Sequence, residues 1–222
     1  MSAPDPPQPA ARLPIAVLIS GRGGNMIAIA NACRSGAIAA RITRVISDQP
    51  NAVGIARAQA LGIDTTIVAV PEFENRERFE AALVTAIDAS GAQLVVLAGF
   101  MRILSSAITD HYAGRMLNIH PSLLPKFPGL HTHQRALAAQ EREHGASVHF
   151  VTSELDAGPL VIQARAPVLP GDTAESLSAR VQPLEHRIYP KVIGWIAAGR
   201  LRVVNDRPWF DGIPLEHPLL EC

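Results

Sequence analysis

The segment that decides the fold is Ile15–Asn25, with the sequence IAVLISGRGGN. Its apolar first half predicts a buried strand, its glycines predict a tight turn, and Met26–Arg34 predicts a helix that Gly36 ends. Backbone N–H groups at such a helix start favour a bound anion. Met26 stands where a dinucleotide fingerprint has its third glycine, which favours a single phosphate over NAD. A plain strand-to-helix turn that uses glycine for a positive φ angle explains the same residues.

Outward from this segment, strands and helices alternate. The next strands are predicted at residues 41–47, 65–70, 94–98 and 116–120, with helices at 52–61 and 76–90 between them. Strands that alternate with helices form parallel units with right-handed crossovers. We therefore predict an α/β fold, a mostly parallel twisted sheet with helices on both faces in a Rossmann-like arrangement.

The pattern changes after Pro121. A proline-rich loop precedes a predicted helix at 132–141, strands at 147–151 and 160–167, and a C-terminal hairpin of 201–204 with 209–210. Asp172 and Glu175 predict a capping box at the start of a long helix. Pro190 is expected to kink or interrupt that helix.

The composition is that of a globular protein with balanced charge. The 222 residues include 20 acidic and 20 basic side chains. Nucleic-acid-binding domains carry a basic surplus, so we expect no nucleic-acid partner. No apolar run is long enough to span a bilayer, and the N-terminal sequence lacks a secretory pattern, so we expect no membrane partner. Cys33 and Cys222 offer neither a metal-binding spacing nor a disulfide framework, which suits the reducing cytoplasm.

The segment Asn118–Pro125, NIHPSLLP, carries the most chemical information. Asn118 and His120 lie two residues apart at the predicted end of a strand, so their side chains share one face of the sheet. Ligands of open α/β sheets bind beyond such strand ends. A hydrogen-bonded loop cap is the alternative explanation of this pair. Asp156, in the polar turn Ser153–Gly158, is of interest only as a partner of His120, because an aspartate in a turn also serves as a turn former.

Together these three side chains suit transfer of an acyl group to an amine. Asn118 could donate a hydrogen bond to the oxyanion of a tetrahedral intermediate. A cationic His120 could donate a second hydrogen bond and then deliver a proton to the leaving group. Asp156 would raise the pKa of His120 and fix its tautomer. No side-chain nucleophile is required, and the chain has no Gly-x-Ser-x-Gly elbow.

The combined motifs resemble the folate-dependent formyltransferase family. The segments that carry the resemblance are Ile15–Asn25, Val95–Leu104, His111–His133, Gly145–Gly158 and Glu185–Pro190, within a similar region of residues 13–205. The resemblance implies that a formyl group passes from 10-formyltetrahydrofolate to the amine of glycinamide ribonucleotide (5-phosphoribosylglycinamide) in purine biosynthesis. It also implies a cytoplasmic enzyme that needs no metal, with a monomer and a homodimer both open.

By the same resemblance, each residue of the site takes a role. The catalytic set is Asn118, His120 and Asp156. The substrate-binding residues are Gly23, Gly24 and Asn25 at the phosphate, with Gln182 and Glu185 near the ribose. The folate-binding residues are Arg76, Met101, Arg102, Ile103, Leu104 and Asn118. Gly24 stands where the family commonly has serine, so the phosphate site lacks one hydroxyl. Without the resemblance, strand-end packing would explain Met101–Leu104.

The resemblance also divides the chain. We expect one domain over residues 14–205, made of a phosphate-binding half at 14–115 and a catalytic, folate-binding half at 116–205. The prolines and alanines of residues 1–13 predict a disordered leader before this domain, and a tail at 206–222 follows it.

Four other functions fit part of the pattern. A formyltetrahydrofolate hydrolase passes the formyl group to water. Hydrolases of this kind resemble the chain, but they carry an extra N-terminal regulatory domain and a second histidine where this chain has Pro121. A methionyl-tRNA formyltransferase is longer and needs a basic RNA-binding module. A non-catalytic module that binds a phosphate ligand would leave the three catalytic candidates without a role. A metal site would draw on His120, His131, His133, His144 and His149, but no carboxylate or cysteine spacing supports one.

Overall fold

The structure is a computed structural model that describes residues 12–221, so most of the leader expected at residues 1–13 lies outside the described residues. The strands are β1 (Leu13–Ile19), β2 (Ala40–Ser47), β3 (Thr65–Ile67), β4 (Leu94–Leu97), β5 (Met116–His120), β6 (Glu143–Phe150), β7 (Leu160–Pro167), β8 (Leu201–Val204), β9 (Arg207–Phe210), β10 (Ile213–Pro214) and β11 (Leu219–Glu221). The helices are α1 (Gly24–Ser35), α2 (Val53–Ala60), α3 (Arg76–Asp88), α4 (Ser106–His111), α5 (Thr132–Ala138) and α6 (Ala174–Ala197), with a 3-10 turn η1 (Val70–Glu72).

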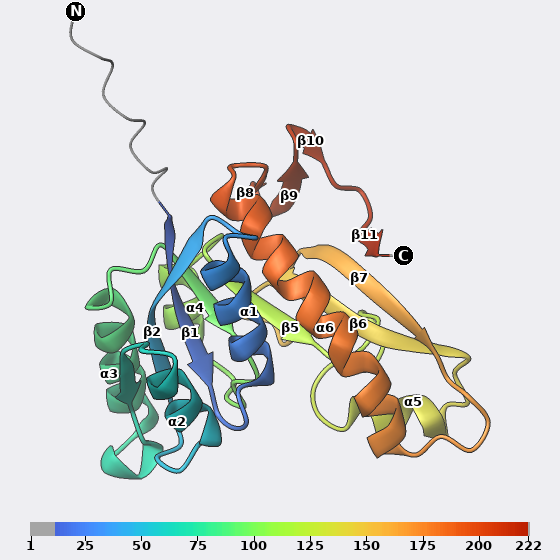
Figure 1. Cartoon of the computed structure of the whole chain (residues 1–222), viewed down its shortest axis with the longest axis horizontal. Helices are drawn as coiled ribbons and strands as arrows, with labels where there is room; N and C mark the ends of the chain where they lie inside the picture. The colour runs from blue at the N-terminus through green and yellow to red at the C-terminus, as the bar shows by residue number, and fades with distance from the viewer. Residues whose placement is uncertain (1–11, 222) are drawn as a thin grey trace, which may run out of the picture.

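An eight-stranded sheet forms the centre of the molecule, in the order β11-β7-β6-β5-β4-β1-β2-β3 (Figure 1). The strands from β1 to β5 pair in parallel, whereas β6 is antiparallel to both β5 and β7. The mostly parallel sheet that the sequence predicts is confirmed. The predicted C-terminal hairpin is confirmed in β8 and β9, which form a small antiparallel sheet with β10. β11 then returns to the large sheet and pairs in parallel with β7.

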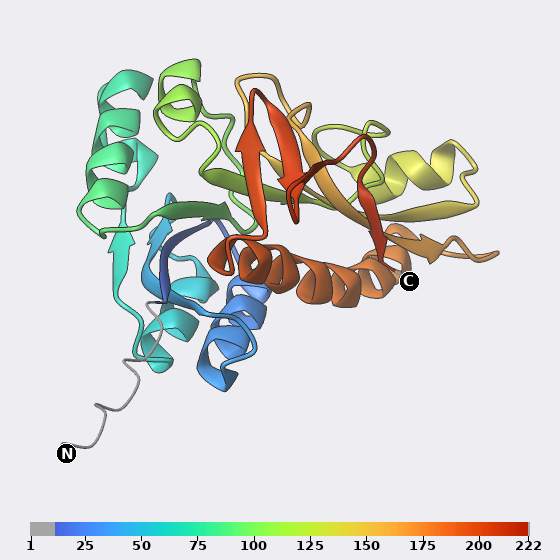
Figure 2. The same ribbon diagram turned by 90° about the horizontal axis from the view of Figure 1, so that it is seen from above.

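Helices cover both faces of the sheet because successive residues of β1 point to opposite sides. Ile15 and Val17 pack into one core with residues of α1, α2 and α6. Ala16 and Leu18 pack into a second core with residues of α3 and α4. Figure 2 shows the two groups of helices on opposite sides of the sheet. A strand that is buried on both faces needs a continuous apolar sequence, which is what Ile15–Ile19 provides.

The start of α6 differs from its prediction. The predicted capping pair of Asp172 and Glu175 is wrong, because the N-cap is Thr173 and the capping box is completed by Ser176. The carboxylate of Asp172 instead forms an ion pair with Arg180 at 2.5 Å. This ion pair ties the first turns of the helix to the loop before it.

α6 also continues through Pro190, so the predicted interruption is wrong. Pro190 is itself buried, and Ile188 and Val192 on either side of it belong to the core under the helix. Burial of this stripe offsets the backbone hydrogen bond that proline removes. No helix among the described residues is long and apolar enough to cross a membrane.

Candidate active site

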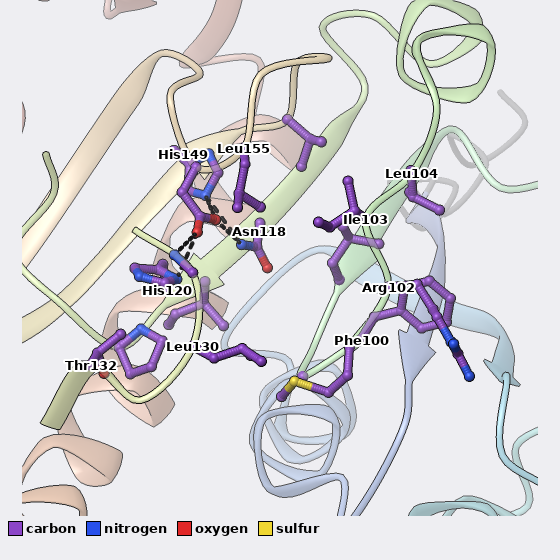
Figure 3. Close-up of a pocket in the computed structure, with 18 of the residues that line it drawn as sticks. Phe100, Arg102, Ile103, Leu104, Asn118, His120, Leu130, Thr132, His149 and Leu155 are labelled. Atoms are coloured by element: carbon purple, nitrogen blue, oxygen red, sulfur yellow. Dashed lines mark hydrogen bonds and ion pairs between the residues drawn. The ribbon is translucent and has the colours of Figure 1, made fainter. Parts of the chain in front are cut away.

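A cavity of about 420 Å³ opens at the C-terminal ends of β4 and β5. Its walls come from the loop between β4 and α4, the loop before α5, and the turn between β6 and β7 (Figure 3). This is the edge of the sheet where open α/β folds bind their ligands. The three segments lie far apart in the sequence, so only the folded chain forms the cavity.

Asn118 and His120 lie together at one wall of this cavity (Figure 3), and Asp156 belongs to the same wall. Asn118 and His120 project from β5, and the turn after β6 brings Asp156 to them. Oδ2 of Asp156 lies 3.4 Å from Nδ1 of His120, and both side chains are less than a tenth exposed. Nδ2 of Asn118 donates to Oδ1 of Asp156 at 3.4 Å. The structure therefore brings the three candidate catalytic side chains together around one carboxylate.

The backbone fixes the position of Asp156 independently of these side chains. Asp156 has a positive φ angle of 51°, and the N–H of Gly129 donates to its Oδ2 at 2.8 Å. A Cβ atom at Gly158 would lie 1.9 Å from the carbonyl oxygen of Phe150. The turn thus needs glycine at this point, and its close approach to β6 sets where the carboxylate lies.

His149 is the member of the site that sequence reasoning missed as a catalytic neighbour. It lies opposite Asn118 in the antiparallel pairing of β5 and β6. Its Nε2 is 3.1 Å from Nδ2 of Asn118 and 3.6 Å from Oδ1 of Asp156. Its Nδ1 lies 3.0 Å from the carbonyl oxygen of Phe150, which accepts from the ring when that nitrogen carries a proton. His149 therefore holds the carboxamide of Asn118 in position from the neighbouring strand β6.

Burial controls the electrostatics of His120. Burial lowers the pKa of His120 below its ordinary value, although the carbonyl of Phe127 and the carboxylate of Asp156 both act to raise it. Asp156 therefore acts in the expected direction, but the net shift of this pKa is downward, because desolvation of the charged ring outweighs the two acceptors. Burial also raises the pKa of Asp156, but hydrogen bonds from His149 and Gly129 outweigh it and lower that pKa. At neutral pH the pair is a neutral imidazole beside a carboxylate.

The predicted phosphate loop connects β1 to α1. Gly23 is the N-cap of α1, with a φ angle of 71° and no side-chain cap. A Cβ atom at Gly23 would lie 3.0 Å from Cα of Gly54. Glycine is thus required both by the left-handed backbone and by the close approach of α2. The free N–H groups at the start of α1 point beyond the end of β1.

Residues of α6 lie beside this loop. Nδ2 of Asn25 donates to Oε2 of Glu185 at 2.7 Å. Burial raises the pKa of Glu185, and the bond from Asn25 opposes that shift only in part. Gln182 approaches Gly24, since Nε2 of Gln182 would be 3.5 Å from a Cβ atom there. None of the five predicted substrate-binding residues lines the cavity, and they gather instead at the end of β1, next to β4 in the sheet.

Five of the six predicted folate-binding residues line the cavity, and one lies outside it. Met101 and Ile103 line the cavity and are 67% and 63% exposed. Leu104 is buried in the core, although it also borders the cavity. Arg102 also borders the cavity, but its side chain points away from Asn118 and His120 (Figure 3). Asn118 lines the cavity as well, whereas Arg76, on α3, lies outside its lining.

Comparison with known proteins decides the family. The model of the formyl transferase family matches residues 13–193. The chain belongs to the formyl transferase family. It is 52% identical over 198 residues to phosphoribosylglycinamide formyltransferase of Escherichia coli strain K12, which covers 89% of this chain and 93% of that protein. The solved structure of phosphoribosylglycinamide formyltransferase from Coxiella burnetii matches it with a TM-score of 0.90 and 53% identity, over 94% of this chain and 99% of that one.

A third comparison bears on the rival hydrolase. The structure of formyltetrahydrofolate deformylase from Burkholderia mallei matches this formyl transferase with a TM-score of 0.82 but 26% identity. The match covers 90% of this chain and 70% of that one. The higher identity and fuller coverage of the phosphoribosylglycinamide formyltransferases favour them as the nearer relatives in function. The family and the fold predicted from the motifs are both confirmed.

Three further histidines, His131, His133 and His144, lie beside the site. His131 and His133 border the cavity, and Nε2 of His144 lies 3.1 Å from Nδ1 of His133. Within residues 12–221, no three histidine, cysteine, aspartate or glutamate side chains are grouped so that they could hold a metal ion together.

Proposed function

We propose that the protein transfers the formyl group of 10-formyltetrahydrofolate to the amine of glycinamide ribonucleotide. The proposal is supported by the formyl transferase family match and by the relatives named phosphoribosylglycinamide formyltransferase. The single observation that carries it is the convergence of Asn118, His120 and Asp156 in one cavity. A module that only binds a phosphate ligand has no use for that arrangement.

The reaction begins when the neutral amine of the acceptor attacks the formyl carbon. The formyl oxygen becomes an oxyanion, and the amide N–H of Asn118 donates a hydrogen bond to it. His120 is neutral in the resting site, because burial lowers its pKa, and it accepts the proton that the amine nitrogen releases, directly or through water.

The second half of the reaction expels tetrahydrofolate. The imidazolium of His120 now lies between two acceptors, Asp156 and the carbonyl of Phe127, so it is stabilised where it forms. It returns the proton to N10 of the folate as the bond between that nitrogen and the formyl carbon breaks. The products are tetrahydrofolate and the N-formyl amide, and no metal enters any step.

The two substrates take separate parts of the site in this proposal. The phosphate lies at the start of α1 on Gly23, Gly24 and Asn25, with Gln182 and Glu185 toward the ribose. The folate lies in the cavity against the segment Met101–Leu104. Arg76 holds this segment through its hydrogen bond to the carbonyl oxygen of Ile103. These assignments are supported by the position of both sites at the C-terminal ends of the adjacent strands β1, β4 and β5.

The setting of the enzyme is proposed from its chemistry. Cys33 is a free, buried thiol, which suits the reducing cytoplasm. Two small molecules suffice as partners, without nucleic acid or membrane. A monomer and a homodimer both fit the proposal, because every residue in it comes from one chain.

A direct assay tests the proposal. The purified protein is incubated with 10-formyltetrahydrofolate and glycinamide ribonucleotide, and both tetrahydrofolate and the formylated ribonucleotide are measured. We expect the two products in equal amounts, with little tetrahydrofolate formed when the ribonucleotide is left out. Rapid release of formate without the ribonucleotide would show the hydrolase activity instead and overturn the proposal.

A further inference from the structure

The loop from β4 to α4, residues 98–105, is held in place by side chains from other parts of the chain. It has no helix or strand of its own. Met101 and Ile103 nevertheless extend their apolar side chains into the open cavity, which costs free energy unless a ligand covers them. An irregular loop that presents exposed apolar side chains needs external support to keep one conformation.

Four anchors supply that support. The N–H of Met101 donates to Oγ of Ser20 at 2.9 Å, and Nε of Arg102 donates to Oδ2 of Asp48 at 2.8 Å. The side chain of Arg102 is therefore engaged within the protein and holds the loop against β2. The other two anchors come from α3.

Glu80 on α3 is the point where these two anchors meet. Its Oε1 accepts from Nε of Arg76 at 2.8 Å and from the N–H of Ser105 at 3.0 Å. Its Oε2 accepts a short hydrogen bond from the hydroxyl of Ser105. The same arginine donates from Nη2 to the carbonyl oxygen of Ile103 at 2.8 Å. One carboxylate thus fixes the end of the loop directly and its centre through Arg76.

The charge of Glu80 is maintained although the residue is buried. Only 8% of Glu80 is exposed. Burial raises its pKa, but hydrogen bonds from Ser105 and Arg76 outweigh the burial and leave the pKa below its ordinary value. A buried carboxylate that is fully paired is costly to replace, because removing it leaves Arg76 and the Ser105 N–H without their partner.

We propose that Glu80 is a positioning residue for the folate, which acts through Arg76 and Ser105 to hold the Met101–Leu104 backbone in its binding conformation. This inference rests on the proposed function, since it takes that backbone as the folate site. It separates Glu80 from the acceptor, because the hydrogen bonds of Glu80 go to Arg76 and Ser105, whereas the loop after β4 meets the end of β1 at Ser20.

Glu80→Ala tests the inference, with Glu77→Ala as the matched control. Glu77 is exposed in the first turn of the same helix and makes none of the loop contacts. For Glu80→Ala we expect the KM for 10-formyltetrahydrofolate to rise about tenfold, with kcat and the KM for the ribonucleotide within about twofold of wild type. Titration with tetrahydrofolate itself should give a matching loss of affinity. Glu77→Ala should behave as wild type in all four measurements.

Three outcomes would overturn the inference or its basis. An unchanged folate KM in a folded Glu80→Ala protein removes the positioning role. An equal loss of affinity for both substrates shows a merely structural role. A wild-type protein that binds no tetrahydrofolate would overturn the proposed function itself, which the first two outcomes leave standing.

A second variant covers the case in which Glu80→Ala does not fold. Ser105→Ala removes one hydrogen bond of the same network and must still raise the folate KM selectively.

Discussion

Nδ1 of His120 faces Oδ2 of Asp156 at 3.4 Å, while Nε2 of the same ring lies 2.9 Å from the carbonyl oxygen of Phe127. Both ring nitrogens therefore meet acceptors, yet burial lowers the pKa of the ring. The resting site holds a neutral imidazole that is surrounded by groups suited to its protonated form. Such a site favours a group that takes up a proton during the reaction and gives it away again.

Replacing either partner should reduce turnover while leaving the fold intact. His120→Ala removes the group that carries the proton, and Asp156→Asn removes the charge that stabilises the imidazolium. We expect each to lower kcat by about 10²-fold or more, measured in the formyl transfer assay. Asp110→Asn, at an exposed aspartate on α4, is the control and should retain wild-type turnover. Near-normal kcat for either site variant would contradict its role.

The pH profile offers a second test of the same pair. His120 must be neutral to accept a proton, so kcat/KM should fall as the pH drops through its pKa, which lies below the ordinary 6.5. The charge of Asp156 raises that pKa, so Asp156→Asn should move the acid limb of the residual activity to lower pH. Titration of the substrate amine is the same in both proteins and cannot produce the difference. A limb that moves to higher pH would count against His120 as the base.

Local sequence patterns were sufficient for the parts of the site that lie on one strand. Asn118 and His120 occupy a strand whose predicted bounds, 116–120, agree with β5. Their two-residue spacing places them on one face whatever the rest of the chain does. The buried first strand and the glycine turn after it are likewise local features, and the structure places both as predicted.

Long-range relationships were beyond the reach of such patterns. His149 faces Asn118 only because β6 runs antiparallel to β5, and the prediction began that strand at residue 147 instead of 143. The sign of the His120 pKa shift depends on burial by the whole surrounding structure, which no single partner reveals. The support that Glu80 gives to the loop after β4 is of the same kind, since its partner Ser105 lies 25 residues away in the sequence.

His144 should make the stability of the protein depend on pH. Burial lowers its pKa from 6.5 to about 4, with His133 adding to the shift. Between these values the unfolded chain binds a proton that the folded chain does not, so stability falls as the pH falls. From this histidine alone we expect the free energy of unfolding to drop by about 2 kcal/mol between pH 7 and pH 5. Urea titrations of wild type and His144→Gln should differ in this slope, and His217→Gln, at an exposed histidine, should follow wild type.

The phosphate loop should be sensitive to a single methyl group. Gly23→Ala and Gly36→Ala both place alanine at a positive φ angle, so both should lose roughly 1 kcal/mol of stability. Only at Gly23 does the added Cβ atom meet the backbone of α2, whereas at Gly36 it meets open space. We therefore expect Gly23→Ala alone to raise the KM for the ribonucleotide by about tenfold or more, with a smaller effect on folate. Equal losses for both substrates would contradict the assignment of the loop to the phosphate.

At Gly24, unlike Gly23, we expect a substitution to increase stability and substrate affinity. Nε2 of His186 is buried and has no hydrogen-bond partner among the described residues. A Cβ atom at Gly24 would lie 3.1 Å from that nitrogen, so a serine hydroxyl at this position can reach it once the ring shifts slightly. With the ring proton on Nε2, His186 donates to the serine oxygen, which stabilises the protein by about 1 kcal/mol and leaves the hydroxyl proton free to donate at the start of α1.

We therefore expect Gly24→Ser to raise the melting temperature by a few degrees and to lower the KM for the ribonucleotide about two- to fivefold. Gly24→Ala is the control, because it adds the same crowding against His186 without the hydroxyl and should lose stability. The φ angle at Gly24 is not in the left-handed region, so backbone strain does not enter the comparison. If serine and alanine destabilise the protein alike, the imidazole has no room to move, and the unpaired nitrogen is not what limits this loop.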